Sequence, residues 1–249
     1  MLIYINLQSP SNFTSPNHFI PGVLMTNTAR FELYSFWRTS ATYRVRVALN
    51  LKGVQAHERN VNLDAGEQRG EAFLKINPMG AIPALIDTQP GQPGTPITQS
   101  LAILEFLDEV YPSPALLPAD PHGRARVRSL AAMLAADTHP LITPRVKKYL
   151  MAEAKFDDAA WRAWQMQWFT TGLQALEQRL ASEAQTGSFC HGETATLADI
   201  CLASILVVMR VFKIEVANIP TVQRIMANCE KLEAFAKAAP SLQVGAPQP

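Results

Sequence analysis

The sequence predicts an α/β domain followed by an all-helical domain. From Phe31 onward, short apolar runs alternate with helical patterns over roughly 80 residues, the usual size of a compact domain. The segment YPSPALLPADPHG follows, and its four prolines cannot continue a helix. After Gly123 the apolar residues recur at helical spacing. We therefore expect a disordered extension over 1–30, an α/β domain over 31–112, a linker over 113–123, a helical domain over 124–240 and a tail over 241–249.

The composition is that of an ordinary globular protein. The chain has 249 residues, of which 48% are hydrophobic and 17% are charged. A net charge of +1 argues against nucleic acid and against a membrane surface as partners. No run approaches the ~20 apolar residues that a membrane-spanning helix needs. The three cysteines, Cys190, Cys201 and Cys229, form no Cys-x-x-Cys pair, so we expect small buried residues in a reducing compartment, the cytoplasm.

The N-terminal extension has no signal-peptide pattern. Residues 1–30 lack a basic start, an apolar centre and a small-residue cleavage site. They are rich in Ser, Pro and Asn without periodicity, which is typical of disorder. Because Met25 lies just ahead of the first regular pattern, we expect translation to start there.

The N-terminal domain is predicted to run strand, helix, strand, helix, strand, strand, helix. FELYS (31–35) favours a strand, and Thr39-Ser40 offers hydroxyl caps for the helix that follows as far as Lys52-Gly53. The remaining elements are expected at 57–63 (strand), 71–76 (helix), 84–87 and 96–97 (strands), and from Gln99-Ser100 onward (helix).

The helical domain is indicated by apolar stripes. Residues 200–212 are apolar nearly all round, which predicts a buried central helix, and Thr196 to Asp199 fit a capping box ahead of it. The segment 221–239 predicts one final amphipathic helix. Two further stripes are Val127, Leu130, Met133 and Leu134, and Trp161, Trp164 and Trp168.

Arg38-Thr39-Ser40 is the first candidate site. Backbone N–H groups and the dipole at a helix start favour negative charge, so a thiolate held there would have a lowered pKa. The chain has no cysteine at this point, so the thiol would belong to a ligand. The alternative is that Thr39 or Ser40 only caps the helix.

Three further segments could contact a ligand. A cis proline at Ile82-Pro83 would expose the main chain of Ile82 to an extended peptide, whereas a trans proline would simply begin a strand. Gln99-Ser100 could bind a carboxylate or cap its helix. Arg145, near His139, could grip a carboxylate or remain a solvated surface residue. The sequence shows no metal-ligand spacing, no Gly-x-Ser-x-Gly elbow and no phosphate-binding glycine loop.

In order, these segments resemble the cytosolic glutathione transferases over nearly all of 31–240. YSFWRTSATYRVRVALNLKG is similar to the signature of the zeta class, which contains maleylacetoacetate isomerases and, as a close relative, the glutathione-dependent maleylpyruvate isomerase. INPMGAIPALI resembles the family's cis-proline segment. QSLAILEFLDEVYPSPALLPADP resembles its second glutathione-binding segment and linker, and FCHGETATLADICLA the start of its central helix.

The resemblance implies a thioredoxin-like N-terminal domain on an all-α domain, a homodimer, glutathione as cofactor and a small dicarboxylic acid as substrate. The activity implied is cis–trans isomerisation of a maleyl diacid in the breakdown of aromatic compounds. Thr39 and Ser40 would activate the thiolate, while Arg38 and Arg145 would hold the substrate carboxylates. The glutathione-binding residues would be Gln68, Ile82, cis Pro83, Gln99, Ser100, His139 and Thr143.

Four departures from the family pattern leave alternatives open. Ala41 stands where many relatives have cysteine, and Thr39 replaces serine. Ile142-Thr143-Pro144 interrupts a segment that is often Asn-Asn, and Val211 stands where an arginine is common. A general glutathione transferase or a haloacid-dehalogenating enzyme is therefore the nearest rival. A non-catalytic binding module is the alternative from another class.

Overall fold

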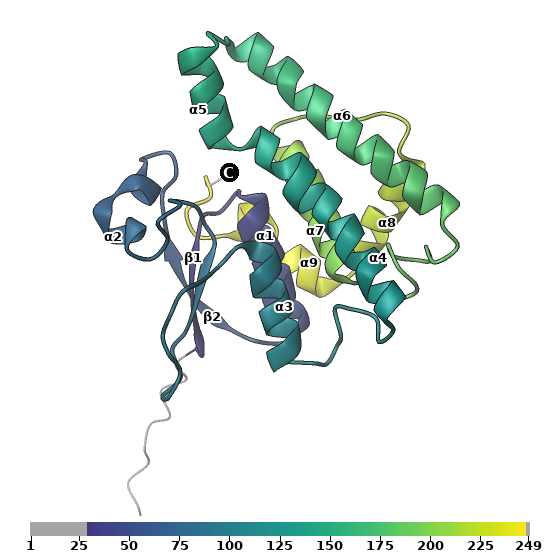
Figure 1. Ribbon diagram of the computed structural model, residues 1–249, viewed down its shortest axis with the longest axis horizontal. Coiled ribbons are helices and arrows are strands. Elements are labelled where there is room, and N and C mark those ends of the chain that lie inside the picture. Colours follow the sequence, from purple (N-terminus) through teal and green to yellow (C-terminus); the bar gives the residue numbers. More distant parts are fainter. Residues whose placement is uncertain (1–28, 248–249) are drawn as a thin grey trace, which may run out of the picture.

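The computed structural model describes residues 29–247 (Figure 1). The N-terminal part contains a mixed four-stranded sheet in the order β2-β1-β3-β4. Its elements are β1 (Phe31–Ser35), α1 (Ser40–Leu51), β2 (Ala56–Asn60), a 3-10 turn (Glu67–Arg69), α2 (Glu71–Leu74), β3 (Ala84–Asp87), β4 (Ile97–Thr98) and α3 (Ser100–Val110).

The sheet gives the N-terminal domain its two faces. Strand β1 runs parallel to β2 and antiparallel to β3, with Leu33 opposite Leu85. Phe31, Leu33 and Leu85 are fully buried, because alternate residues of these strands point into the core. Helices α1 and α3 pack together on one face, and α2 lies on the other side (Figure 1). The carboxyl end of β1 therefore leads directly into the start of α1.

The rest of the chain is helical. It contains α4 (Pro121–Ala132), a π-helical turn (Met133–Thr138), a 3-10 turn (His139–Ile142), α5 (Pro144–Glu153), α6 (Asp158–Ser182), α7 (Leu197–Val211), α8 (Pro220–Glu230), α9 (Glu233–Lys237) and a last 3-10 turn (Pro240–Leu242). Helix α7 is buried along most of its length and packs against α1, α4 and α8. No helix within 29–247 is both long and apolar enough to cross a bilayer.

The two parts of the chain are joined around α1. Lys52 follows α1, and its buried ammonium lies 2.6 Å from Asp108 Oδ1 on α3 and also donates to the carbonyl of Pro114. The same carboxylate oxygen accepts the N–H of Leu116 at 2.8 Å. Asn50 donates to the carbonyl of Ala234, which ties the far end of the chain to α1. These contacts fix α1 between the sheet and the helical domain.

Most expected elements are confirmed, including the element order of the N-terminal domain and the buried helix at 200–212. The capping box of Thr196 and Asp199 is present in both directions. The single helix expected over 221–239 is wrong: Leu232 is extended, and α9 starts anew so that Phe235 packs against the core. Helix α4 begins at Pro121, ahead of Gly123, because Asp120 caps it by accepting the Gly123 N–H at 2.7 Å.

The chain ends bear on two further expectations. Residues 1–28, with the proposed start at Met25, lie outside the described residues. Arg30, which was assigned to the disordered extension, is ordered, because its guanidinium bonds Asp87 at 2.6 Å and the hydroxyl of Tyr111 at 2.9 Å. At the other end Gly245 passes close to Trp37, just before the first candidate site. The three cysteines are free and buried, as expected.

Candidate active site

The start of α1 is an uncapped helix N-terminus. Thr39 occupies the N-cap position, but its side chain accepts no main-chain N–H. Instead its Oγ1 lies 2.7 Å from the hydroxyl of Thr42. Ser40 is buried, and its Oγ has no hydrogen-bond partner among residues 29–247. The capping interpretation of these hydroxyls is therefore wrong, and the first turn keeps donors available for an anion.

Arg38 already faces a carboxylate. Its guanidinium forms a two-pronged ion pair with Asp64, in which Nη1 lies 2.8 Å from Oδ2. The guanidinium also stacks near the rings of Phe36 and Trp37, at 5.1 and 5.3 Å from their centres. Both partners are partly exposed, so the pair is a weak one. A planar, two-pronged donor of this kind can exchange one carboxylate for another.

The proline segment and Gln68 lie together. The Ile82-Pro83 peptide bond is cis, as expected. In the described chain the N–H of Ile82 bonds no other main-chain group. Gly80, at a φ of 58°, approaches the carbonyl of Gln68 so closely that a Cβ would lie 2.8 Å from it. Gln68 Oε1 is buried and, like Ser40 Oγ, has no hydrogen-bond partner among the described residues.

Gln99 and Ser100 begin α3. Gln99 has a φ of 69°, a conformation that costs energy for any residue with a Cβ. Ser100 is buried at the first position of the helix, and its Oγ accepts a hydrogen bond from Arg44 Nε at 2.9 Å. Arg44 belongs to α1, so α1 and α3 present their N-terminal ends to the same region.

His139, Thr143 and Arg145 approach from the helical domain. His139 is half-buried directly after the π-helical turn. Burial, with the nearby charges of Arg44 and Arg145, lowers the pKa of His139 to about 3. The imidazole is therefore neutral at physiological pH. The Thr143 hydroxyl donates to the carbonyl of Pro140 at 2.9 Å, and Arg145 is exposed on the first turn of α5.

Three residues at this site were missed by the sequence interpretation. They are Thr42, which pairs with Thr39, Asp64, which pairs with Arg38, and Arg44, which lies under Ser100. Arg44 could have been found, because a charged residue between Tyr43 and Val45 interrupts the apolar character of a helix buried on nearly every side. The other two depend on contacts that the sequence pattern does not encode.

The positions that depart from the family pattern are also placed. Ala41 is buried beside the two hydroxyls. Val211 is half-buried at the end of α7, and the neighbouring Arg210 is turned outward into an ion pair with Glu230.

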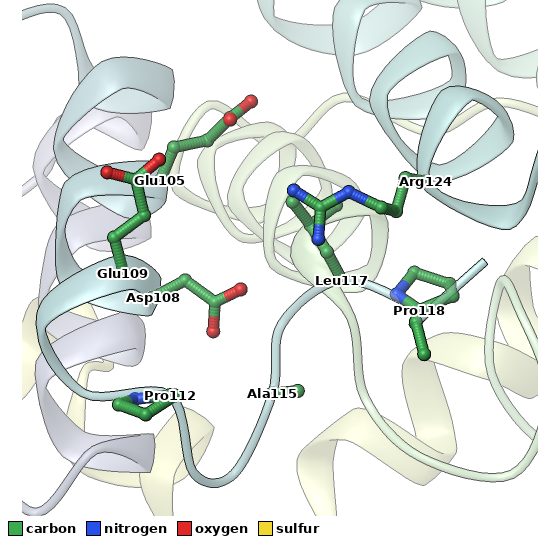
Figure 2. A pocket seen from close by; sticks show the side chains of 9 residues that line it. Glu105, Asp108, Glu109, Pro112, Ala115, Leu117, Pro118 and Arg124 are labelled. Carbon is green, nitrogen blue, oxygen red and sulfur yellow. The ribbon is translucent and has the colours of Figure 1, made fainter. Parts of the chain in front are cut away.

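A cavity beside α3 is lined by residues other than the candidate site residues. A cavity of about 330 Å³ opens between α3, the linker and α4 (Figure 2). Glu105, Asp108 and Glu109 project from α3, and Arg124 faces them from α4. Glu105 is already paired with Arg128 at 2.7 Å, and Asp108 with Lys52. We therefore assign this cavity to the joint between the domains and not to the site at Thr39.

Comparison with known proteins gives the class. Residues 29–109 match the family described as Glutathione S-transferase, N-terminal domain. A maleylpyruvate isomerase from Ralstonia sp. is 41% identical over 85% of this chain and 98% of its own length. A maleylacetoacetate isomerase from Rhizobium meliloti is 41% identical over 84% of this chain and 95% of its own length.

Solved structures agree. The maleylacetoacetate isomerase of Methylobacterium extorquens AM1, with bound malonate and glutathione, aligns with a TM-score of 0.83 at 46% identity, covering 87% of this chain and all of that one. A maleylpyruvate isomerase described as a zeta-class bacterial glutathione S-transferase aligns with a TM-score of 0.82 at 40% identity, with the same coverage. The chain belongs to the glutathione S-transferase family, within the group of zeta-class maleylacetoacetate and maleylpyruvate isomerases.

Proposed function

We propose that this protein isomerises a maleyl diacid from cis to trans with glutathione as cofactor. The observation that carries the proposal is the uncapped start of α1, where the Thr39 and Ser40 hydroxyls meet free main-chain donors. The names of the relatives support the reaction class. The ligands of solved structures support the chemistry, since one contains malonate with glutathione and another contains dicarboxyethyl glutathione with citrate.

The residues present fit glutathione. Two buried oxygens, Ser40 Oγ and Gln68 Oε1, have no partner in the described chain, and a polar ligand would satisfy them. The free N–H of Ile82 is suited to pair with the cysteinyl main chain of the tripeptide. Ser100 and Gln99, at the start of α3, would bind the γ-glutamyl carboxylate. His139 and Thr143 would close the site from the helical domain.

The reaction needs a stabilised thiolate and two groups that bind the carboxylates of the substrate. When bound, glutathione supplies a sulfur nucleophile that adds to the cis double bond, permits rotation about the resulting single bond and leaves again as the trans bond forms. The Thr39 or Ser40 hydroxyl would donate to the sulfur and keep it ionised. Arg38 and Arg145 would hold the substrate carboxylates and stabilise the negative charge that develops on addition.

An absorbance assay tests this function. The purified protein is given maleylpyruvate or maleylacetoacetate, with and without glutathione. Turnover of either substrate that requires glutathione is expected, and Arg38→Ala should lower kcat/KM more than it weakens glutathione binding. Arg59→Ala is the matched control, because Arg59 also pairs with a carboxylate on the sheet surface but lies on β2. Absence of turnover with both substrates would contradict the proposal.

A glutathione transferase or haloacid-dehalogenating activity is the second candidate. It is favoured by Val211, which removes one arginine from the region where carboxylates would be held. In that case the glutathione thiolate would displace a leaving group from the substrate, and the product would be a stable conjugate of glutathione with the substrate.

We also propose that the enzyme acts as a homodimer in the cytoplasm. The free cysteines fit a reducing compartment. Helices α3 and α4 carry both signs of charge, with Glu105 and Glu109 on α3 and Arg124 on α4 (Figure 2). Glu105 also pairs with Arg128 of α4. A patch with both signs can pair with its own copy across a twofold axis. Light scattering should give twice the chain mass, and a monomer would contradict this.

A further inference from the structure

Arg44 is a buried cation without a carboxylate partner. It is 2% exposed, and within 29–247 it forms no ion pair with any acidic side chain. The other cations buried to a similar degree around α1 are paired: Arg46 lies 2.7 Å from Glu58, and Lys52 lies 2.6 Å from Asp108. Burying an unpaired charge is costly, so it calls for a counter-charge from elsewhere.

The neighbours of Arg44 do not supply that counter-charge. Its two bonded partners are hydroxyls: Nε donates to Ser100 Oγ at 2.9 Å, and Nη1 donates to Ser204 Oγ at 3.3 Å. Nearby, burial raises the pKa of the Cys201 thiol to about 11, so this group stays protonated. The neutral imidazole of His139 also carries no negative charge. The region around the guanidinium therefore has an uncompensated positive charge.

The hydrogen bonds also set the direction of the Ser100 hydroxyl. A guanidinium can only donate, so Ser100 Oγ accepts from Arg44 and its own proton remains available. Ser204 differs, because its proton is already given to the carbonyl of Cys201 at 2.7 Å. Ser100 lies at the first turn of α3, beside main-chain N–H groups that also favour an anion.

We infer that Arg44 is a positioning residue for the γ-glutamyl carboxylate of glutathione. It turns the Ser100 hydroxyl into a donor toward that carboxylate, and the bound carboxylate balances its buried charge. Arg44 also donates to Ser204 of α7. Its side chain therefore connects glutathione binding in the N-terminal domain to the central helix of the helical domain. This inference rests on the proposed placement of glutathione at Gln99 and Ser100.

The test compares two peptides in a binding titration. One is glutathione, and the other is 4-aminobutyryl-Cys-Gly, which lacks only the α-carboxylate of the γ-glutamyl residue. We expect Arg44→Met to raise the Kd for glutathione by about tenfold or more, as loss of a charge-assisted contact does. The Kd for the decarboxylated peptide should change much less. Ser100→Ala should likewise reduce the preference for glutathione over the decarboxylated peptide. When Ser100→Ala is combined with Arg44→Met, either Kd should change little further.

Stability provides the second readout. Because Arg44→Met removes an unpaired buried charge, the ligand-free variant should be no less stable than the wild type. The matched control is Arg46→Met on the same helix, which leaves Glu58 without its partner. It should lower stability and weaken both peptides alike, if it affects them at all. Arg44→Lys keeps the charge and should recover part of the selectivity.

Two results with the variants would overturn the inference. One is an equal loss of affinity for both peptides in Arg44→Met, and the other is a loss of stability like that of Arg46→Met, since either means a purely structural role. A wild-type protein that binds both peptides equally would also overturn it while leaving the isomerase proposal intact. Conversely, a protein that prefers glutathione but does not isomerise either substrate would contradict the proposed function alone.

Discussion

At the start of α1, the hydroxyls of Thr39 and Thr42 form a hydrogen-bonded pair. Thr39 and Thr42 are 2.7 Å apart, and a hydroxyl can rotate to donate or accept. In the structure the Thr39 hydroxyl donates to Thr42; if both hydroxyls rotate so that Thr42 donates to Thr39, the proton of Thr39 becomes available to a sulfur anion. The buried hydroxyl of Ser40 is the competing donor, because it has no partner in the part of the chain that the structure describes.

Substituting Thr39 and Ser40 one at a time should separate the roles of their hydroxyls. Thr39→Ala should raise the pKa of the bound glutathione thiol and lower kcat roughly 10- to 100-fold at neutral pH, the worth of one hydrogen bond to a charged group. Thr39→Ser should keep most of the activity. The measurement is thiolate absorbance of the glutathione complex against pH. A larger effect of Ser40→Ala would assign the role to Ser40 instead.

His139 should make stability depend on acidity. Its pKa is about 3 in the folded protein, against an ordinary value of 6.5. Between these values the unfolded chain binds more protons, so stability rises with pH and is lost as the pH falls from 6.5 toward 3. In His139→Gln this loss should be smaller, as urea denaturation at a series of pH values would show. Equal pH dependence in both proteins would contradict the expectation.

The π-helical turn before His139 packs closely against α6, because residue 172 of that helix is a glycine. A Cβ on Gly172 would lie 2.2 Å from Thr138 Oγ1. Thr138 itself is buried and donates to the carbonyl of Met133 at 2.8 Å, within the turn. Gly172 therefore permits the close approach of α6 to the turn that precedes His139, a candidate site residue.

Gly172→Ala should destabilise the protein by about 1–3 kcal/mol through overpacking, although alanine normally favours a helix. The free energy of unfolding from chemical denaturation measures this. Thr138→Ala removes the two nearest atoms, so the double variant should be more stable than the sum of the single effects predicts. Additive effects would show that the contact does not limit packing there.

Elements with local signals were predictable, and elements shaped by distant contacts were not. The capping box of Thr196 and Asp199 marks the start of α7 within four residues. The break at Leu232 carries no glycine or proline and arises because Phe235 must reach the core around α1. The site follows the same division. Its hydroxyls, its proline and Ser100 occur in recognisable segments, whereas Asp64 and the role of Arg44 depend on the folded neighbours.

In the molecule as a whole, the candidate site lies where the two parts of the chain meet. Helix α1 contributes hydroxyls from its first turn and Arg44 from its middle. Lys52, which follows this helix, holds the linker by donating to the carbonyl of Pro114. The helical domain adds His139 from a turn and Ser204 from its central helix. We therefore expect glutathione to bind across α1 and α3 and to be used without being consumed.

The most direct measurement counts product molecules per glutathione. The maleyl substrate is supplied in large excess over glutathione, and both trans product and free thiol are followed to completion. The account predicts that all substrate is isomerised while the thiol concentration returns to its starting value. A reaction that stops after one product per glutathione, with the thiol lost to a conjugate, would contradict the account and identify a transferase.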